Sequence, residues 1–189
     1  QLGRAIVRRL AQAGASVAVH YQKNRDKAQE LCREAEEMGV GVCAVQADVT
    51  ELQSVLQMRD RVEQDLGAPQ IVVAAAVIQY PNWTRILDQP EEDFRSQFES
   101  CVLHNVNLAK AFLPAMKEAG WGRYIGINTE CSRLCLPGQG AYASAKGGMD
   151  TLLRILAKEA GPWGVTVNQV APGWMISDRY REAPEDDRA

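Results

Sequence analysis

The sequence has few of the side chains on which metal sites and disulfide frameworks depend. It contains only two histidines, His20 and His104, and its five cysteines are odd in number and lie within apolar segments. Cys131 and Cys135 are four residues apart but have no second pair with which to form a zinc site. We therefore expect no metal site, and we expect reduced thiols in a cytoplasmic compartment.

An excess of positive charge and long apolar runs are also missing. Lys and Arg number 21 against 24 Asp and Glu, so the net charge is -3 and no basic field exists to attract nucleic acid or anionic lipid. No apolar run is long enough to cross a membrane, and we recognise no signal peptide. We therefore expect neither nucleic acid nor a membrane as a partner.

What remains is the composition of one ordinary globular domain over residues 1–189, with 46% hydrophobic and 24% charged residues. Short β-rich runs alternate with helical stretches, which is typical of a parallel sheet covered by helices on both faces. The first helix begins near Leu2 and ends at Gly14. The further elements expected are strands at 16–20, 42–45, 71–77, 123–128 and 165–171 and helices at 24–38, 50–66, 91–117 and 141–160.

Local signals add detail to this order. The continuous apolar run 71–77 predicts a strand buried on both faces at the centre of the sheet. Thr50 and Gln53 have the spacing of a capping box at the start of a helix, and Asp88 and Glu91 are expected to cap the next long helix. In that helix a single apolar seam is expected, made of Phe94, Phe98, Cys101, Leu108 and Phe112.

Tyr142 and Lys146 are the strongest chemical signal in the chain. Residues four apart on a helix share a face, so phenol and ammonium can meet, and a nearby cation lowers the pKa of a phenol. Such a tyrosine can act as an acid or base near neutral pH. The alternative is a buried ring with a lysine that extends its charge to solvent. Thr129, 13 residues before Tyr142, ends a strand, and its hydroxyl either converges with the phenol or bonds its own backbone.

With Thr129, Tyr142 and Lys146 the chain resembles the short-chain dehydrogenase/reductase family, and especially its 3-oxoacyl-carrier-protein-reductase-like branch. The resemblance covers nearly the whole chain. It implies a doubly wound Rossmann-type α/β fold of three layers, with the first strand and the C-terminal part lying outside the printed sequence. It also implies hydride transfer between a nicotinamide cofactor and a ketone or secondary alcohol, in which Tyr142 protonates the alkoxide, Lys146 assists it and Thr129 binds the carbonyl oxygen.

The same resemblance implies a set of cofactor contacts. Gly3 looks like the last glycine of the family's phosphate-binding loop, and the alternative for a lone glycine is simple helix packing. Asp48 would accept from the adenine amino group, or would be a turn residue before Thr50. The residues expected to contact the cofactor, besides Tyr142 and Lys146, are Gly3, Tyr21, Lys23, Asp48, Val49, Ala75, Ala76, Pro172, Gly173 and Ser177.

The end of the first expected strand bears on the choice of nicotinamide cofactor. Relatives that use NAD carry an acidic residue there, whereas this chain has Tyr21, Lys23 and Arg25. Either cation could meet a 2′-phosphate, so we expect NADP, with NAD possible; the alternative is that both cations belong to a solvated loop.

Two departures from the family pattern bear on activity. The family's Asn-Asn-Ala-Gly segment is replaced by residues 74–77, Ala-Ala-Ala-Val, and its fourth catalytic residue, an Asn that holds a water for the lysine, is replaced by Cys101. A thiol donates only weakly, so we interpret Cys101 as an apolar filler in preference to a nucleophile, and we expect impaired proton supply. The alternative function is a nucleotide-binding or scaffold protein with little or no turnover. An unrelated flavodoxin-type domain is disfavoured because no acidic cluster or FMN loop is apparent.

Assembly follows from the two long helices. The family's counterparts of helices 91–117 and 141–160 pack against another subunit, and Leu152, Leu153, Ile155 and Leu156 spread over more than one helix face. We therefore expect a homotetramer or dimer that acts on a small-molecule carbonyl or alcohol substrate.

Overall fold

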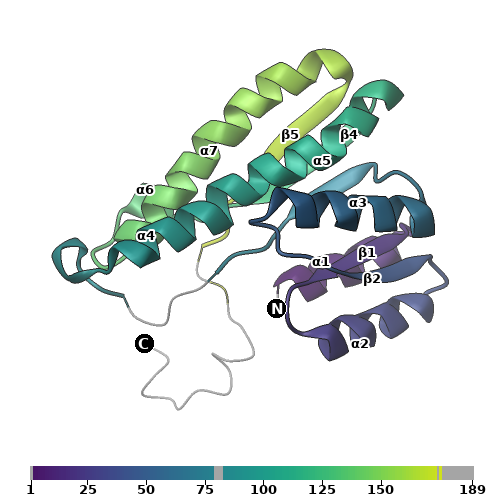
Figure 1. Cartoon of the computed structure of the whole chain (residues 1–189), viewed down its shortest axis with the longest axis horizontal. Coiled ribbons are helices and arrows are strands. Elements are labelled where there is room, and N and C mark those ends of the chain that lie inside the picture. Colours follow the sequence, from purple (N-terminus) through teal and green to yellow (C-terminus); the bar gives the residue numbers. More distant parts are fainter. Residues whose placement is uncertain (1, 79–82, 174, 176–189) are drawn as a thin grey trace.

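The computed structural model describes residues 2–78, 83–173 and 175, and its elements follow the predicted order of strands and helices (Figure 1). The strands are β1 (Val17–Tyr21), β2 (Val42–Gln46), β3 (Ile71–Ala74), β4 (Gly122–Ile127) and β5 (Val165–Val170). The α-helices are α1 (Leu2–Gln12), α2 (Arg25–Glu36), α3 (Leu52–Leu66), α4 (Glu91–Phe98), α5 (His104–Ala119), α6 (Cys131–Leu134) and α7 (Gly140–Ala160). Short helical turns are η1 (Ile86–Asp88), η2 (Glu99–Leu103) and η3 (Gly161–Trp163), of which η2 is a π-helix.

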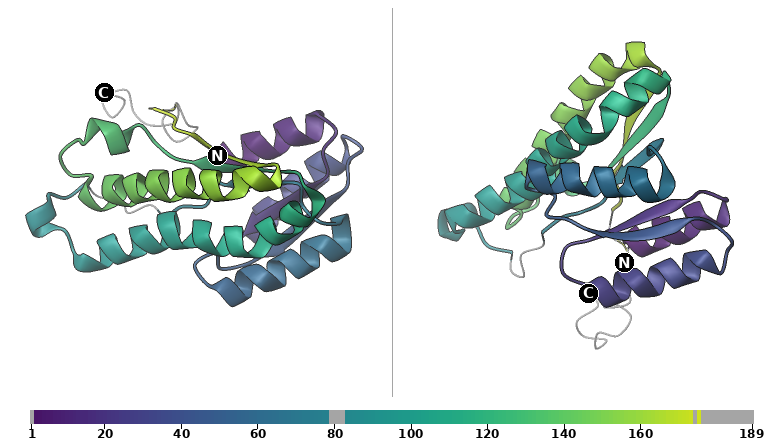
Figure 2. Two further views of the ribbon diagram at one scale, coloured as in Figure 1. Left: turned by 90° about the horizontal axis from the view of Figure 1, so that it is seen from above. Right: turned by 45° about the vertical axis from the view of Figure 1, so that its right-hand side comes forward.

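Strands β1 and β2 pair in parallel and carry helices on both faces. The alternation of side chains along β1 explains this arrangement, because Val17 and Val19 face α1 and α2 while Ala18 packs toward the core that contains α3. Figure 2 shows α3 on one side of this sheet and α1 and α2 on the other. This part of the chain therefore has the three predicted layers.

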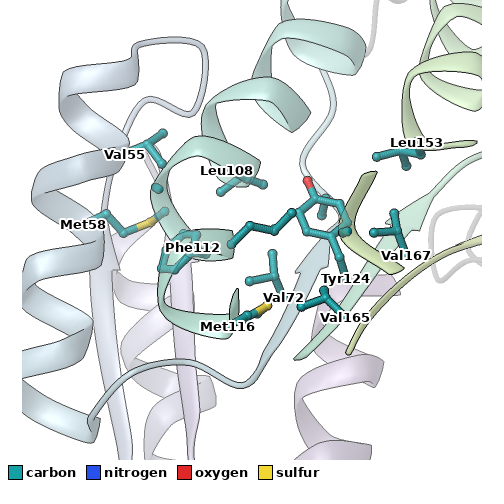
Figure 3. Packing of buried hydrophobic residues seen from close by; sticks show 14 of the residues in the cluster. Val55, Met58, Val72, Leu108, Phe112, Met116, Tyr124, Leu153, Val165 and Val167 are labelled. Carbon is teal, nitrogen blue, oxygen red and sulfur yellow. The ribbon is translucent and has the colours of Figure 1, made fainter. Parts of the chain in front are cut away.

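Strands β3, β4 and β5 form a second parallel sheet, in that order, which α5 and α7 cover on one face. Figure 3 shows Tyr124 of β4 surrounded by Leu108, Met116 and Val165 in the core between sheet and helices. No described helix covers the opposite face, and Ile71 is 40% exposed there. The prediction that 71–77 is a strand buried on both faces is therefore wrong in the described structure, and the strand ends at Ala74.

The two sheets are not hydrogen-bonded to each other in the described residues. Both are parallel, and α3 joins them by packing against β2 and α5, so they share one hydrophobic core. The family resemblance predicts a further strand between these two inner edges, which would pair with both of them. The doubly wound α/β class is confirmed, with the sheet in two parts.

Two predictions about the helices are wrong. Pro90 precedes α4 with no side-chain cap, and Asp88 lies in η1, so Asp88 and Glu91 do not cap a continuous helix. The π-helical turn η2 divides the expected helix and adds a residue to the turn, which rotates the face presented to the core. Phe98 is consequently 49% exposed, whereas the neighbouring Gln97 is buried. The predicted apolar seam does not pass through Phe98.

Candidate active site

Helix α7 lies close to β4 because Gly126 has no side chain. A Cβ atom at Gly126 would lie 2.6 Å from Met149 Cε and would also overlap Leu153, so no larger residue fits without movement. This close approach brings Lys146, one turn before Met149, over the carboxyl end of β4. There Lys146 Nζ donates a 2.7 Å hydrogen bond to the carbonyl of Ile127.

The structure brings Tyr142 and Lys146 together on α7. Lys146 Nζ lies 5.9 Å from the centroid of the Tyr142 ring, with Lys146 buried and Tyr142 half-buried. Burial lowers the pKa of Lys146, and the neighbouring Cys101 thiol opposes that shift. The lysine does not extend to solvent, so the alternative of a snorkelling surface lysine is wrong.

Thr129 is buried two residues after Ile127, whose carbonyl binds Lys146 Nζ. Its Oγ1 accepts a 3.3 Å hydrogen bond from the Cys131 amide, which is the local backbone bond expected of a strand-end threonine. The hydroxyl proton is left for another acceptor, so this bond and a substrate contact are compatible.

The sequence interpretation did not single out Asn128, whose Nδ2 donates to Gln169 Oε1 (2.7 Å) and to the carbonyl of Lys146 (3.3 Å). Asn128 therefore ties the strand end to α7 and β5.

Cys101 is fully buried, as the interpretation of an apolar filler requires. Its Sγ is a weak donor to Gln97 Oε1 at 3.9 Å. Burial raises the pKa of the Cys101 thiol, although the Lys146 charge acts in the opposite direction. The thiol is therefore protonated near neutral pH and is poorly suited to act as a nucleophile.

A buried polar network lies next to Cys101 and was not found from the sequence. His104 Nδ1 donates to the carbonyl of Ser100, so His104 Nε2 is the acceptor for Asn105 Nδ2 at 3.2 Å. Asn105 Nδ2 also donates to the Cys101 carbonyl (2.7 Å), and Asn105 Oδ1 accepts from the Tyr124 hydroxyl (2.7 Å). Burial lowers the pKa of His104 from 6.5 to about 4. These side chains bond the carbonyls of the π-helical turn, a role that only its irregular geometry creates.

Gly3 lies at the start of α1, in an open position. A Cβ atom built there meets nothing within 4 Å, so packing does not require glycine at this place. The helix-packing alternative for Gly3 is therefore wrong in the described structure. An exposed glycine at a helix N-terminus suits close approach of a phosphate to the backbone.

Asp48 follows β2 and organises the loop that leads into α3. Its Oδ1 accepts from the Thr50 amide (3.0 Å) and hydroxyl (2.6 Å), and its Oδ2 accepts from Gln22 Nε2 (2.8 Å). The hydrogen bonds from Thr50 lower the pKa of Asp48. The predicted capping box of Thr50 with Gln53 is wrong, because the Thr50 hydroxyl bonds Asp48 and α3 begins after Glu51 without a side-chain cap.

The remaining predicted cofactor residues occupy strand ends. Tyr21 is half-buried at the end of β1 and Lys23 is exposed just beyond it, while Val49 is half-buried after β2. Ala75 and Ala76 are half-buried directly after β3. These residues follow the carboxyl ends of parallel strands, where open α/β sheets bind their ligands.

The turn after β5 holds Pro172 and Gly173. The Pro172 carbonyl accepts from the Glu130 amide (3.2 Å), which joins this turn to the end of β4. A Cβ atom at Gly173 would lie 2.6 Å from Glu130 Oε1, so a larger residue there would require the Glu130 side chain to move. The predicted contact Ser177 lies outside the described residues.

The described residues contain no group of three or more His, Cys, Asp or Glu side chains able to hold a metal ion. None of the described helices is both long enough and apolar enough to span a bilayer. A cleft between α7 and β5 reaches Thr129 but is not lined by Tyr142 or Lys146, so we do not assign it to the substrate.

Comparison with known proteins agrees with this arrangement. The family model described as enoyl-(acyl carrier protein) reductase matches residues 1–189. A 3-oxoacyl-[acyl-carrier-protein] reductase of Pseudomonas aeruginosa is 34% identical, over 99% of this chain and 74% of its own length. An NADPH-dependent aldehyde reductase-like protein, chloroplastic, of Arabidopsis thaliana is 33% identical, over 95% of this chain and 70% of its own.

Solved structures of dehydrogenases are also similar to this chain. The complex of an alcohol dehydrogenase from Thermococcus sibiricus with 5-hydroxy-NADP has a TM-score of 0.84 and 28% identity, covering 93% of this chain and 73% of that one. NAD+-bound xylitol dehydrogenase has a TM-score of 0.89 over 96% of this chain and 70% of its own, and at 24% identity it supports the fold alone. The chain therefore belongs to the short-chain dehydrogenase/reductase family, in its 3-oxoacyl-acyl-carrier-protein-reductase-like branch.

Proposed function

We propose that the protein transfers a hydride between NADP(H) and a ketone or secondary alcohol of small size. The observation that carries this proposal is the Tyr142–Lys146 pair, held over the end of β4 beside Thr129 by the bond from Lys146 Nζ to Ile127 O (2.7 Å). An acid, a buried cation and a hydroxyl at one strand end are the groups that carbonyl reduction requires.

Each side chain has a distinct role in this mechanism. Tyr142 donates its phenolic proton to the oxygen of the substrate as negative charge develops there. Lys146 stabilises the resulting phenolate, because its ammonium lies on the same side of α7. The Thr129 hydroxyl donates to the same substrate oxygen and orients the carbonyl. The nicotinamide supplies or accepts the hydride when the cofactor is bound.

The residues present fit a dinucleotide. The open position over Gly3 admits a pyrophosphate at the N-terminus of α1, and Asp48, Val49, Ala75 and Ala76 would line the path of the nucleotide along the strand ends. Lys146 would also bind the nicotinamide ribose. Pro172, Gly173 and Ser177 would hold the nicotinamide end.

The preference for NADP depends on a balance of charges at the end of β1. Lys23 and Arg25 are exposed and favour a 2′-phosphate, as the plant relative's NADPH-dependent name also does. The hydrogen bond from Gln22 brings the Asp48 carboxylate to the same place, where it opposes that phosphate. Asp48→Asn should therefore lower the Kd for NADPH by about 3- to 10-fold relative to the Kd for NADH, measured by fluorescence titration.

Asp60→Asn on α3 is the matched control, because Asp60 is an exposed carboxylate that pairs with the adjacent Arg59. It should leave the ratio of the two dissociation constants unchanged. An unchanged ratio in Asp48→Asn would contradict the charge argument, and equal wild-type affinities for NADH and NADPH would remove the preference itself.

Activity tests the catalytic assignment. NADPH oxidation should be followed with a panel of ketones and the full-length protein. Tyr142→Phe should abolish reduction while NADPH still binds, because the phenol proton is lost and the ring remains. Cys101→Asn should raise turnover, because an amide is a better hydrogen-bonding group than a thiol. Activity that survives in Tyr142→Phe would refute the mechanism.

The second candidate function is a nucleotide-binding or scaffold protein. The buried Cys101 thiol and the Ala-Ala-Ala-Val run at 74–77 favour it, because both replace polar side chains that the family uses. Binding of NADPH without reduction of any ketone, and without rescue by Cys101→Asn, would establish this function instead.

A dimer or homotetramer accompanies the proposed activity. Ile155 on α7 is 51% exposed and Leu103 of η2 is 40% exposed, on the helices that would form the subunit contact. Sedimentation that shows only monomer at micromolar concentration would contradict this assembly.

A further inference from the structure

Glu130 places a carboxylate at the end of β4 that the proposed mechanism does not use. It follows Thr129 directly, and its amide donates to the Pro172 carbonyl (3.2 Å), which fixes its backbone against the turn after β5. A Cβ atom built at Gly173 would lie 2.6 Å from Glu130 Oε1 and 2.9 Å from Oε2. Both carboxylate oxygens therefore lie against the turn that holds Pro172 and Gly173.

The fold around Glu130 makes no use of this charge. Glu130 occupies the N-cap position of α6, but its side chain makes no capping hydrogen bond. Among the residues that the structure describes, no ion pair includes Glu130, although Arg133 is only three residues further on. The side chain is exposed, and a lone exposed carboxylate adds little to the stability of a fold. Its main effect is therefore on a molecule that binds beside it.

The neighbours of Glu130 are groups that the proposed function assigns to substrate and cofactor. Thr129 would bind the carbonyl oxygen, and Pro172 and Gly173 would hold the nicotinamide end. The helix α6, which Glu130 precedes, packs against α7, the helix that carries Tyr142. A ketone bound between the Thr129 hydroxyl and the nicotinamide would therefore have one of its substituents on the Glu130 side.

We propose that Glu130 is a specificity-determining residue that favours ketones with a hydroxyl or ammonium group next to the carbonyl. This inference rests on the proposed function. An ionised carboxylate only accepts hydrogen bonds, so it binds hydroxyl and ammonium donors and repels a second anion. The substrate class is thus a small hydroxyketone or aminoketone, or the corresponding alcohol, and ketones with a carboxylate next to the carbonyl are poor substrates.

Methyl ketones of nearly equal size test this specificity. The values of kcat/KM for butanone, hydroxyacetone, aminoacetone and pyruvate should be measured with NADPH and the full-length protein. Because these ketones differ in intrinsic reactivity, the informative quantity is the change in each ratio to butanone between wild type and Glu130→Gln. The variant should lower the ratio for aminoacetone about 3- to 10-fold, lower that for hydroxyacetone by less, and raise that for pyruvate. Unchanged ratios would overturn the proposal.

Two further variants separate the local charge from other effects. Glu159→Gln is the matched control, because it removes the same exposed charge near the other end of α7 from Tyr142. It should leave all the ratios as in wild type. Glu130→Asp keeps the charge and should retain the preference for aminoacetone better than Glu130→Gln does. An equal loss in Glu130→Asp and Glu130→Gln, or the same change in Glu159→Gln, would contradict a role for the Glu130 charge.

Binding without turnover distinguishes this proposal from the proposed function. With NADPH bound, an alcohol cannot be oxidised, so 1-amino-2-propanol and 2-butanol can be titrated by NMR as unreactive ligands. The preference for 1-amino-2-propanol over 2-butanol should be about 3- to 10-fold larger in wild type than in Glu130→Gln. A wild-type protein that shows this difference but reduces no ketone would refute the proposed function and support the role of Glu130. Equal preferences in both proteins would overturn that role, whatever the turnover.

Discussion

His104 makes the stability of the fold depend on pH in a way that can be calculated. The ring is fully buried, with Nδ1–H donating to the Ser100 carbonyl and Nε2 accepting from Asn105. Protonation would place a proton on Nε2, opposite the amide N–H, and would bury a charge near Lys146. Burial accordingly lowers the pKa of His104 from 6.5 to about 4.

The sign and size of the effect follow from these two values. Between about pH 6.5 and pH 4 the unfolded chain holds a proton on His104 and the folded chain does not. The contribution of His104 to stability is therefore fully present above pH 6.5 and is lost as the pH falls toward 4. Each pKa unit corresponds to about 1.4 kcal/mol, so the free energy of unfolding should fall by about 2 kcal/mol from this group between pH 7.5 and 5.

Urea unfolding followed by tryptophan fluorescence at pH 7.5 and 5 measures this loss. His104→Asn is the informative variant, because the Asn amide can donate to the Ser100 carbonyl but does not titrate. Its unfolding free energy should fall less on acidification than that of the wild type, by about 2 kcal/mol. Carboxylates such as Asp48, whose pKa does not depend on His104, titrate alike in wild type and His104→Asn, so their contributions cancel in this comparison. Equal losses in wild type and His104→Asn would refute the reasoning.

Three further changes have outcomes that the packing determines. Gly126→Ala should lower the free energy of unfolding by about 1–3 kcal/mol, because the added methyl group would push α7 away from β4. The displacement of Lys146 should also slow NADPH oxidation. An unchanged midpoint of urea unfolding would contradict this prediction. Gly164→Ala should be at least as damaging, because φ is +72° and the new Cβ would overlap the Gly120 carbonyl, and wild-type Tm would contradict it. A thiol reagent should label exposed Cys135 in the native protein but Cys101 only after unfolding, and native labelling of Cys101 by mass spectrometry would contradict its burial.

The order of elements was predictable because the chain uses regular periods where the core is apolar. In β5, Val165 and Val167 alternate with exposed residues, so two-residue periodicity locates the strand and its buried face. The Tyr142–Lys146 pair was equally readable, because an uninterrupted helix fixes the geometry of residues four apart. These inferences depend only on local backbone regularity.

The errors occur where regularity fails. The prediction that Phe98 lies on the buried face of the helix is wrong, because no pattern in the sequence indicates the π-helical turn at Glu99–Leu103. Thr50 was assigned to a cap, but the nearby Asp48 carboxylate is the stronger acceptor and takes both of its donors. The role of Asn128 was missed because its partners, Gln169 and the Lys146 carbonyl, are distant in sequence. Such contacts arise from tertiary structure, and a single sequence gives no measure of them.

Several buried polar side chains lie in or beside this π-helical turn, although protein cores are mostly apolar. Gln97, Ser100, His104 and Asn105 are all buried on one short stretch, which packs against α7, the helix that carries Lys146. Apolar residues of similar size would make a more stable core, because each buried polar group must be desolvated and bonded. Departures from local rules that reduce stability are expected where function requires them. The Tyr124 hydroxyl donates to Asn105 Oδ1 (2.7 Å) and the π-helical turn packs against α7, so this polar stretch joins the edge of the apolar core to the helix that carries Tyr142 and Lys146.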